Sequence, residues 1–252
     1  MATLKFYITM ALSGLYTALL SVVFMPFSVI FWSSTITSWV YARCLSFGTL
    51  KILGIKLEVT GREHLAACPA VLMVNHQSNM DAYLFGTVFP KRTVVIAKKE
   101  LLKVPFFGIM LLATGNIMID RDARKAAKQA VEKGTSALKK SKYNLWVFPE
   151  GTRSRGSGLA NFRKGGFHIA ASAGSPIIPI VGQPVETVID LKKKRVYGGL
   201  FRISILPALP APENSAAAIQ KSLGSVEEAV TREWDRLSRL AGFQPTQTGI
   251  SQ

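Results

Sequence analysis

The longest uncharged stretch of the sequence runs from Phe6 to Ala42 and contains no Asp, Glu, Lys or Arg. A straight helix over these residues would extend roughly 55 Å at about 1.5 Å per residue, whereas the hydrocarbon core of a bilayer is about 30 Å thick. The stretch is also longer than the apolar region of a secretory signal peptide, and it lacks a small-residue cleavage site. It therefore predicts a membrane-embedded segment rather than the buried helical hairpin of a soluble protein.

Pro26 lies near the middle of this segment and leaves two arrangements open. One is a single long helix that crosses the bilayer at a tilt. The other is a pair of helices broken near Pro26, because proline removes a helical N–H and its ring clashes with the preceding turn. The second arrangement would dip into one leaflet as a hairpin and return to the same side of the membrane.

The charges that flank the segment are unequal. Lys5 is the only charged residue before it, whereas Arg43, Lys51 and Lys56 follow it. This excess of cations predicts that the rest of the chain lies on the cytosolic side. The whole chain carries a net charge of +16 and is 48% hydrophobic but only 18% charged. These values fit a membrane-associated protein with anionic lipids or substrates as partners, and the apolar N-terminus argues against nucleic acid.

A short apolar strand followed by polar residues forms the first candidate site. Residues 71–74 predict a buried strand that ends before His76. Ser78 can cap a following helix, with Asp81 as its capping-box partner. Ligands bind at the carboxyl ends of strands in open α/β sheets, and a turn would allow the Asp81 carboxylate to fold back on the imidazole. Such a histidine can take a proton from a hydroxyl; the alternative is that Asp81 only caps the helix.

A second polar cluster follows another predicted strand, residues 144–148. The Pro-Glu-Gly sequence at 149–151 predicts a turn with restricted backbone geometry, from which Thr152 and Arg153 project. A solvated surface loop would have the same composition. Two such loops at strand ends in one domain nevertheless predict a shared cleft.

The remaining sequence predicts an α/β domain with a mixed, largely parallel sheet flanked by helices. We expect three regions: an N-terminal membrane segment at 1–45, a catalytic domain at 46–243 and a disordered tail at 244–252. The apolar tract 104–119 predicts a buried or interfacial helix followed by a strand. Further strands are expected at 56–60, 93–97, 177–181 and 200–206, and helices at 79–89, 124–140, 162–173 and 227–240.

Four sequence blocks, in order, resemble those of the glycerolipid acyltransferases. The segment from His76 to Asp81 matches the H-x4-D motif of that family, and Phe148-Pro-Glu-Gly-Thr-Arg-Ser154 is similar to its second signature. The blocks 115–121 and 175–180 resemble the segments between and after these motifs. Within the family, the likeness is greatest to the 1-acyl-sn-glycerol-3-phosphate acyltransferases, and it covers roughly residues 50–210 of this chain.

The resemblance implies a reaction and roles for its residues. The family moves a fatty acyl group from acyl-CoA to the sn-2 hydroxyl of lysophosphatidic acid. His76 would then be the general base and Asp81 would orient it. Arg121 and Arg153 would bind the acceptor phosphate. The other substrate-binding residues implied by the motif are Glu150, Gly151 and Thr152.

Three lysines could extend a positive surface toward the phosphates of CoA: Lys98, Lys99 and Lys164. The resemblance implies no metal and no cofactor, since acyl-CoA is a substrate. The three histidines and two cysteines are not spaced as a metal site or a disulfide framework. The expected location is an integral or monotopic membrane protein, at the endoplasmic reticulum in a eukaryote, with the catalytic domain facing the cytosol.

The motifs leave the acceptor open. A related acyltransferase could use glycerol 3-phosphate or another lysophospholipid. A basic membrane-binding protein without enzymatic activity is the remaining class of function that the charge permits.

Overall fold

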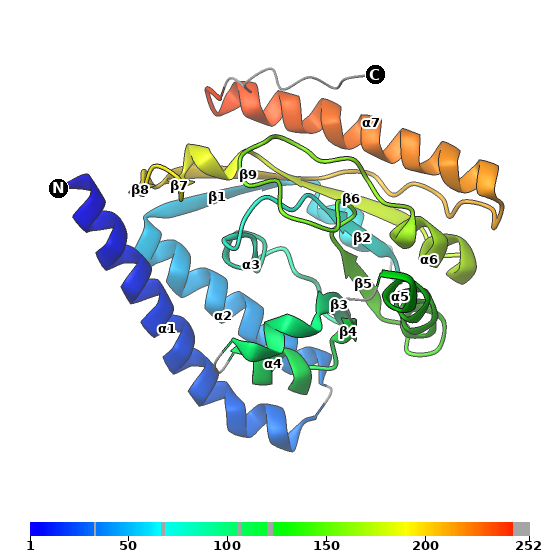
Figure 1. The fold of residues 1–252 in the computed structure, drawn as a ribbon, viewed down its shortest axis with the longest axis horizontal. Helices are drawn as coiled ribbons and strands as arrows, with labels where there is room; N and C mark the ends of the chain where they lie inside the picture. Colours follow the sequence, from blue (N-terminus) through cyan, green and yellow to red (C-terminus); the bar gives the residue numbers. More distant parts are fainter. Residues whose placement is uncertain (33, 67–68, 105–106, 120–122, 244–252) are drawn as a thin grey trace.

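A computed structural model describes residues 1–32, 34–66, 69–104, 107–119 and 123–243 (Figure 1). Its centre is a seven-stranded sheet with the order β1-β9-β6-β2-β5-β3-β4. The strands are β1 (Ile55–Thr60), β2 (Val71–Val74), β3 (Thr93–Lys98), β4 (Ile117–Ile119), β5 (Asn144–Val147), β6 (Ile177–Gly182) and β9 (Gly199–Ile205). All neighbours pair in parallel except β6 and β9, so the predicted mixed, largely parallel sheet is confirmed.

The middle strand β2 is buried on both faces. Leu72 and Val74 point into the hydrophobic core on one side of the sheet, whereas Val71 and Met73 point into the core on the other side. All four side chains are at most 1% exposed. A strand covered on both faces is apolar at every position rather than at alternate ones, which explains the continuous apolar run in the sequence.

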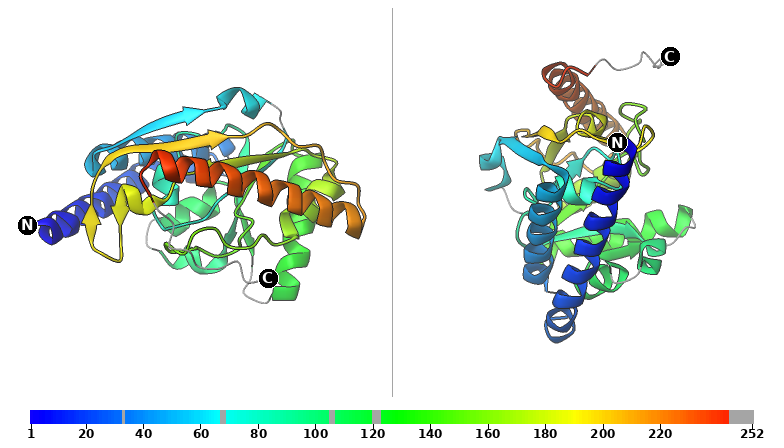
Figure 2. Two further views of the ribbon diagram at one scale, coloured as in Figure 1. Left: turned by 90° about the horizontal axis from the view of Figure 1, so that it is seen from above. Right: turned by 90° about the vertical axis from the view of Figure 1, so that its left-hand side faces the viewer.

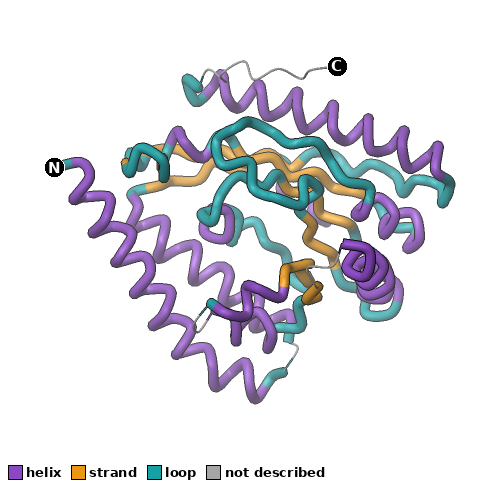
Figure 3. Tube along the Cα trace, in the orientation of Figure 1, coloured by secondary structure: helices purple, strands orange, loops and turns teal. Residues whose placement is uncertain are grey.

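Helices form a layer on each face of the sheet (Figures 1 and 3). The helices α2 (Thr35–Leu53) and α3 (Asp81–Leu84) lie on one face, and α1 (Ala2–Ile30) packs on α2. The opposite face is covered by α5 (Ala123–Lys139), α6 (Gly165–Ala173) and α7 (Ala216–Leu240). The short helix α4 (Phe107–Ala113) packs against α1, and the small hairpin of β7 (Ile189–Asp190) and β8 (Arg195–Val196) lies beside the N-terminal part of α1.

The N-terminal segment forms two antiparallel helices that lie side by side (Figure 2). The expected break near Pro26 is wrong in position: α1 continues through Pro26 to Ile30, and α2 begins at Thr35, capped by the Ser34 hydroxyl, which accepts from Thr37 N at 3.3 Å. A proline removes one backbone hydrogen bond, and helices tolerate this loss where neighbouring groups replace it. The second helix then runs to Leu53, across the expected domain boundary at residue 45.

The polarity of α1 is inverted relative to a helix of a soluble protein. Its buried positions include the hydroxyl residues Thr9, Ser13, Ser21 and Ser28, and each hydroxyl donates to a backbone carbonyl three or four residues earlier. Many of its large apolar side chains are exposed; Leu19, for example, is 57% exposed. Among the described helices, α1 is the one that is long and apolar enough to cross a bilayer, with a mean hydropathy of 1.9.

Two predicted helices have different limits. The helix expected over 79–89 is only the four-residue α3, because Phe85, Val88 and Phe89 enter the core from turns rather than from one helical face. The terminal helix expected over 227–240 begins much earlier, at Ala216, where the Ser215 hydroxyl caps it by accepting from Ala218 N at 3.2 Å. The expected tail at 244–252 lies outside the described residues.

Candidate active site

The two polar clusters of the sequence lie next to each other because β2 and β5 are adjacent and parallel. The loop after β2 (residues 75–80, the β2–α3 loop) and the loop after β5 (residues 148–164, the β5–α6 loop) therefore leave the same edge of the sheet. Two backbone hydrogen bonds join them: Ser154 N donates to His76 O at 2.9 Å, and Arg155 N donates to Gln77 O at 3.0 Å. The predicted meeting of the two loops is thus present in the structure.

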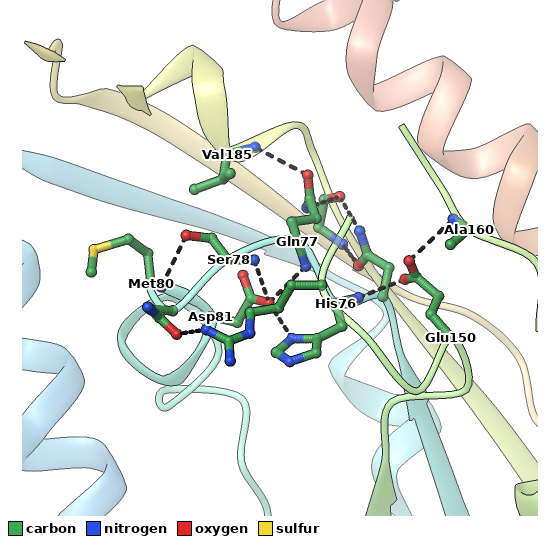
Figure 4. Close-up of polar contacts among 12 residues, drawn as sticks. His76, Gln77, Ser78, Met80, Asp81, Glu150, Ala160 and Val185 are labelled. Atoms are coloured by element: carbon green, nitrogen blue, oxygen red, sulfur yellow. Dashed lines mark hydrogen bonds and ion pairs between the residues drawn. The ribbon is translucent and has the colours of Figure 1, made fainter. Parts of the chain in front are cut away.

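His76 and Asp81 form a hydrogen-bonded pair in this region (Figure 4). The His76 Nδ1 lies 2.7 Å from Asp81 Oδ2, and the same oxygen accepts from Gln77 N at 2.8 Å and from Ser78 N at 3.0 Å. Asp81 is 2% exposed, whereas the His76 side chain is 22% exposed. Since a carboxylate only accepts hydrogen bonds, Nδ1 carries the proton and Nε2 is left to accept one from a substrate.

The imidazole is also held by stacking. The His76 and Phe148 rings lie 4.0 Å apart between centroids, with an angle of 22° between their planes. Phe148 in turn packs edge-on against Trp146 in the core. The orientation of His76 is therefore fixed both by the Asp81 carboxylate and by an aromatic surface, as a general base requires.

Glu150 lies behind the β2–α3 loop. Its Oε1 accepts from His76 N at 2.7 Å, its Oε2 accepts from Ala160 N at 3.1 Å, and the residue is 2% exposed. Burial raises the pKa of the Glu150 carboxyl to about 7, although the hydrogen bonds from His76 N and Ala160 N act in the opposite direction. In this geometry Glu150 supports the backbone of His76, rather than extending into open space where a substrate could reach it.

Two amide side chains on either side of His76 tie the β2–α3 loop to the end of β6. Asn75 Nδ2 donates to Gly182 O at 3.1 Å, and its Oδ1 accepts from Gly182 N at 2.8 Å. Gln77 Nε2 donates to Gln183 O at 2.8 Å, and its Oε1 accepts from Val185 N at 3.1 Å. Sequence reasoning missed both residues, because their partners are about a hundred positions away; the polar residues flanking a histidine at a strand end were the available signal.

Comparison with known proteins agrees with this geometry. A family model described as "Acyltransferase" matches residues 56–183, just over half of the chain. A 1-acyl-sn-glycerol-3-phosphate acyltransferase of Saccharomyces cerevisiae is 34% identical over 212 residues, which cover 83% of this chain and 69% of the yeast protein. The chain belongs to the acyltransferase family. The expected family resemblance is thereby confirmed.

Relatives from other organisms carry the same name. The 1-acyl-sn-glycerol-3-phosphate acyltransferase of Escherichia coli is 40% identical over 56% of this chain, and the human alpha form is 35% identical over 63% of it. Each match spans 56% of the relative's own length. The crystal structure of the 1-acyl-sn-glycerophosphate (LPA) acyltransferase PlsC from Thermotoga maritima has the same fold, with a TM-score of 0.69, 24% identity and 94% coverage of both chains.

The motif arginine and glycine of this acyltransferase lie at the start of the β5–α6 loop. Arg153 is partly exposed, and its Nη1 donates to Asn79 Oδ1, which brings the guanidinium beside the β2–α3 loop. Gly151 has a φ of +68°, and a Cβ there would lie 2.9 Å from the Arg163 side chain. The turn therefore needs glycine for its backbone and for the close approach of Arg163. Thr152 is exposed on the same turn.

The other predicted binding residues are three lysines and Arg121. Lys98 ends β3, whose carboxyl end shares the edge of the sheet with β2 and β5, and Lys99 follows it; both are exposed. Lys164 is exposed immediately before α6. Arg121 follows β4 in the sequence but lies outside the described residues. No group of three potential metal ligands occurs among the residues that the structure describes.

Proposed function

We propose that this protein transfers a fatty acyl group from acyl-CoA to the sn-2 hydroxyl of 1-acyl-sn-glycerol 3-phosphate, giving phosphatidic acid and CoA for phospholipid biosynthesis. The observation that carries the proposal is the pair of His76 and the buried Asp81 at a strand end, beside the loop that bears Arg153. The names of the yeast, bacterial and human relatives support the choice of acceptor.

The chemistry requires a base and no covalent intermediate with the enzyme. His76 Nε2 takes the proton of the sn-2 hydroxyl while its oxygen attacks the thioester carbon. The tetrahedral intermediate collapses, the C–S bond breaks, and the CoA thiolate leaves. The imidazolium can then return its proton to the thiolate. Asp81 stabilises the positive charge on the imidazolium between the two proton transfers, because its carboxylate accepts the hydrogen bond from Nδ1.

The direct test is formation of phosphatidic acid by the purified protein from lysophosphatidic acid and acyl-CoA. A panel with glycerol 3-phosphate and other lysophospholipids separates the alternative acceptors. Preference for one of these over lysophosphatidic acid would replace the proposed acceptor. If no member of the panel were acylated, the proposed enzymatic activity would be wrong.

Arg153 is the described cation best placed to bind the acceptor phosphate, with Arg121 as its expected partner in the sequence. We expect Arg153→Ala to raise the KM for lysophosphatidic acid about tenfold to a hundredfold, since a hydrogen bond to a charged group contributes about 1.5–3 kcal/mol. The KM for acyl-CoA should change much less. Steady-state kinetics with each substrate varied in turn measures both constants. Equal increases in the two values would contradict a role specific to the acceptor.

Membrane association belongs to the same proposal. The inverted polarity of α1 is what a lipid environment favours, because hydroxyl groups pair inside the protein and apolar side chains meet acyl chains. Exposed Ile109 and Leu112 on α4 extend this apolar surface beside α1. We place the two-helix hairpin in the cytosolic leaflet, with the catalytic domain in the cytosol. A substrate could then leave its acyl chain in the bilayer while its head group reaches His76.

Charges introduced on α1 should weaken this association. Leu15 and Leu19 are 56% and 57% exposed, and a lysine at the centre of a bilayer costs about 2.5–3.5 kcal/mol. We expect Leu15→Lys/Leu19→Lys to reduce the fraction of protein that floats with vesicles. Leu240→Lys is the matched control, because Leu240 is 53% exposed at the end of α7 on the other side of the sheet. Equal flotation of the double variant and the control would contradict insertion of α1.

A further inference from the structure

The helix that carries Asp81 is too short to hold its own position. Helix α3 contains only residues 81–84 and has no side-chain cap at its start. A single turn of helix is unstable in isolation, because fixing its backbone costs more than its few hydrogen bonds contribute. Besides the hydrogen bonds from Gln77 N and Ser78 N, the position of Asp81 therefore depends on what α3 packs against.

The N-terminal hairpin supplies that support through two hydroxyl contacts on one residue of α3. The Ser46 hydroxyl on α2 donates to the Tyr83 carbonyl at 2.5 Å, and Ser46 is 0% exposed. The Tyr83 hydroxyl lies 3.3 Å from Thr17 Oγ1 on α1. Both helices of the hairpin thus contact Tyr83, which is two positions from Asp81.

The chain just after α3 also lies directly on α2. A Cβ added at Gly86 would lie 2.4 Å from the carbonyl oxygen of Ala42 and 2.8 Å from Ser46 Cβ. The first of these atoms is backbone in the middle of a helix, so it cannot move aside cheaply. Glycine at position 86 therefore allows a close approach that fixes the distance between α2 and α3.

We infer that Ser46 on α2 and Tyr83 on α3 act as positioning residues that hold Asp81 against His76. The inference rests on the proposed function of the His76–Asp81 pair. It assigns the hairpin a role beyond membrane anchoring. Since the contacts are internal to the protein, they should matter equally for substrates that never enter a bilayer.

The test uses the full-length protein in detergent with a short-chain, water-soluble acyl-CoA and acceptor. We expect Gly86→Ala to lower kcat about a hundredfold, because a displacement of 1 Å at a reacting group can cost about that much. Ser46→Ala, a milder change, should lower kcat about tenfold. In both variants the KM values and the fraction bound to vesicles should stay close to those of the wild type.

The matched controls are a glycine-to-alanine and a serine-to-alanine substitution at positions of the hairpin that do not contact α3. A Cβ at Gly14 on α1 would meet no atom within 4 Å, so Gly14→Ala should leave kcat unchanged. Ser21→Ala removes a hydroxyl that contacts Tyr41 at 2.8 Å inside the hairpin but does not touch α3. We expect its kcat to remain within about threefold of the wild-type value.

A spectroscopic measurement separates this inference from the proposed function. The Nδ1 proton of His76, hydrogen-bonded to Asp81, should give a downfield NMR signal that disappears in His76→Ala. The inference predicts that this signal shifts upfield or broadens in Ser46→Ala and Gly86→Ala, but not in Gly14→Ala or Ser21→Ala, whether or not the protein forms phosphatidic acid. An unchanged signal and unchanged kcat in Ser46→Ala would overturn it, as would equal losses of kcat in Ser46→Ala and Ser21→Ala.

Discussion

Replacement of His76 by alanine should lower the rate of acyl transfer by about 10²–10⁴-fold, the usual contribution of a general base. The imidazole is held both by a buried carboxylate, through Nδ1, and by a stacked ring, on Phe148. These contacts leave Nε2 directed away from Asp81. The loss should appear in kcat, because the base acts on the acceptor hydroxyl in the transition state rather than in binding.

His168→Ala is the matched control for this prediction. His168 lies exposed on α6, on the opposite side of the sheet from α3, and it should be replaceable with little effect on kcat. Vesicle binding and the circular dichroism spectrum should be the same for both variants and the wild type. Turnover of His76→Ala within threefold of the wild-type value would mean that another group removes the proton.

The sequence predicts the two loops of the site well because each follows a strand with a clear signal. The apolar residues 71–74 are buried on both faces, as their composition indicates, and residues 144–147 form the neighbouring strand. The contact between the Asp81 carboxylate and the His76 ring was also predictable. The spacing of five residues includes a turn, and the turn lets the carboxylate accept from the backbone of residues 77 and 78 as well as from the ring.

The residues that the sequence did not reveal are those whose partners are distant along the chain. The amide groups of Asn75 and Gln77 bind residues 182–185, and the pairing of β2 with β6 is what brings these segments together. The break of the N-terminal hairpin was misplaced for a different reason. Pro26 removes one hydrogen bond, but the helix continues to Ile30, and Ser34 caps the next helix.

Glu150 shows how a motif residue can have a role that its sequence position does not disclose. The motif suggests contact with substrate, yet both carboxyl oxygens accept from backbone N–H groups of His76 and Ala160. The carboxyl therefore joins the β2–α3 loop to the middle of the β5–α6 loop. Because the Glu150 carboxyl is buried, its ionisation affects how the free energy of unfolding depends on pH.

Glu150→Gln should change that pH dependence with a defined sign. Burial raises the pKa of the Glu150 carboxyl from 4.5 to about 7 in the folded protein. Because the pKa is higher in the folded protein, the group makes its full contribution to the free energy of unfolding below about pH 4.5. This contribution is lost as the pH rises through about 7. Between pH 5 and pH 8 the wild type should therefore lose about 2.5 kcal/mol of unfolding free energy from this group, at about 1.4 kcal/mol for each unit of pKa shift.

The glutamine side chain cannot ionise, and it also has one hydrogen-bond acceptor fewer than the carboxylate. Its Oε1 can accept from one of the two N–H groups, whereas its amide nitrogen faces the other donor, at a cost of about 1–3 kcal/mol at every pH. We therefore expect Glu150→Gln to be less stable than the wild type at pH 5 and to match or exceed its stability at pH 8. Urea denaturation in detergent at both pH values measures the two differences, with Glu213→Gln on an exposed loop as the matched control. A gap between Glu150→Gln and wild type that stays constant from pH 5 to pH 8 would show that the carboxyl ionises in the folded protein as it does in the unfolded chain.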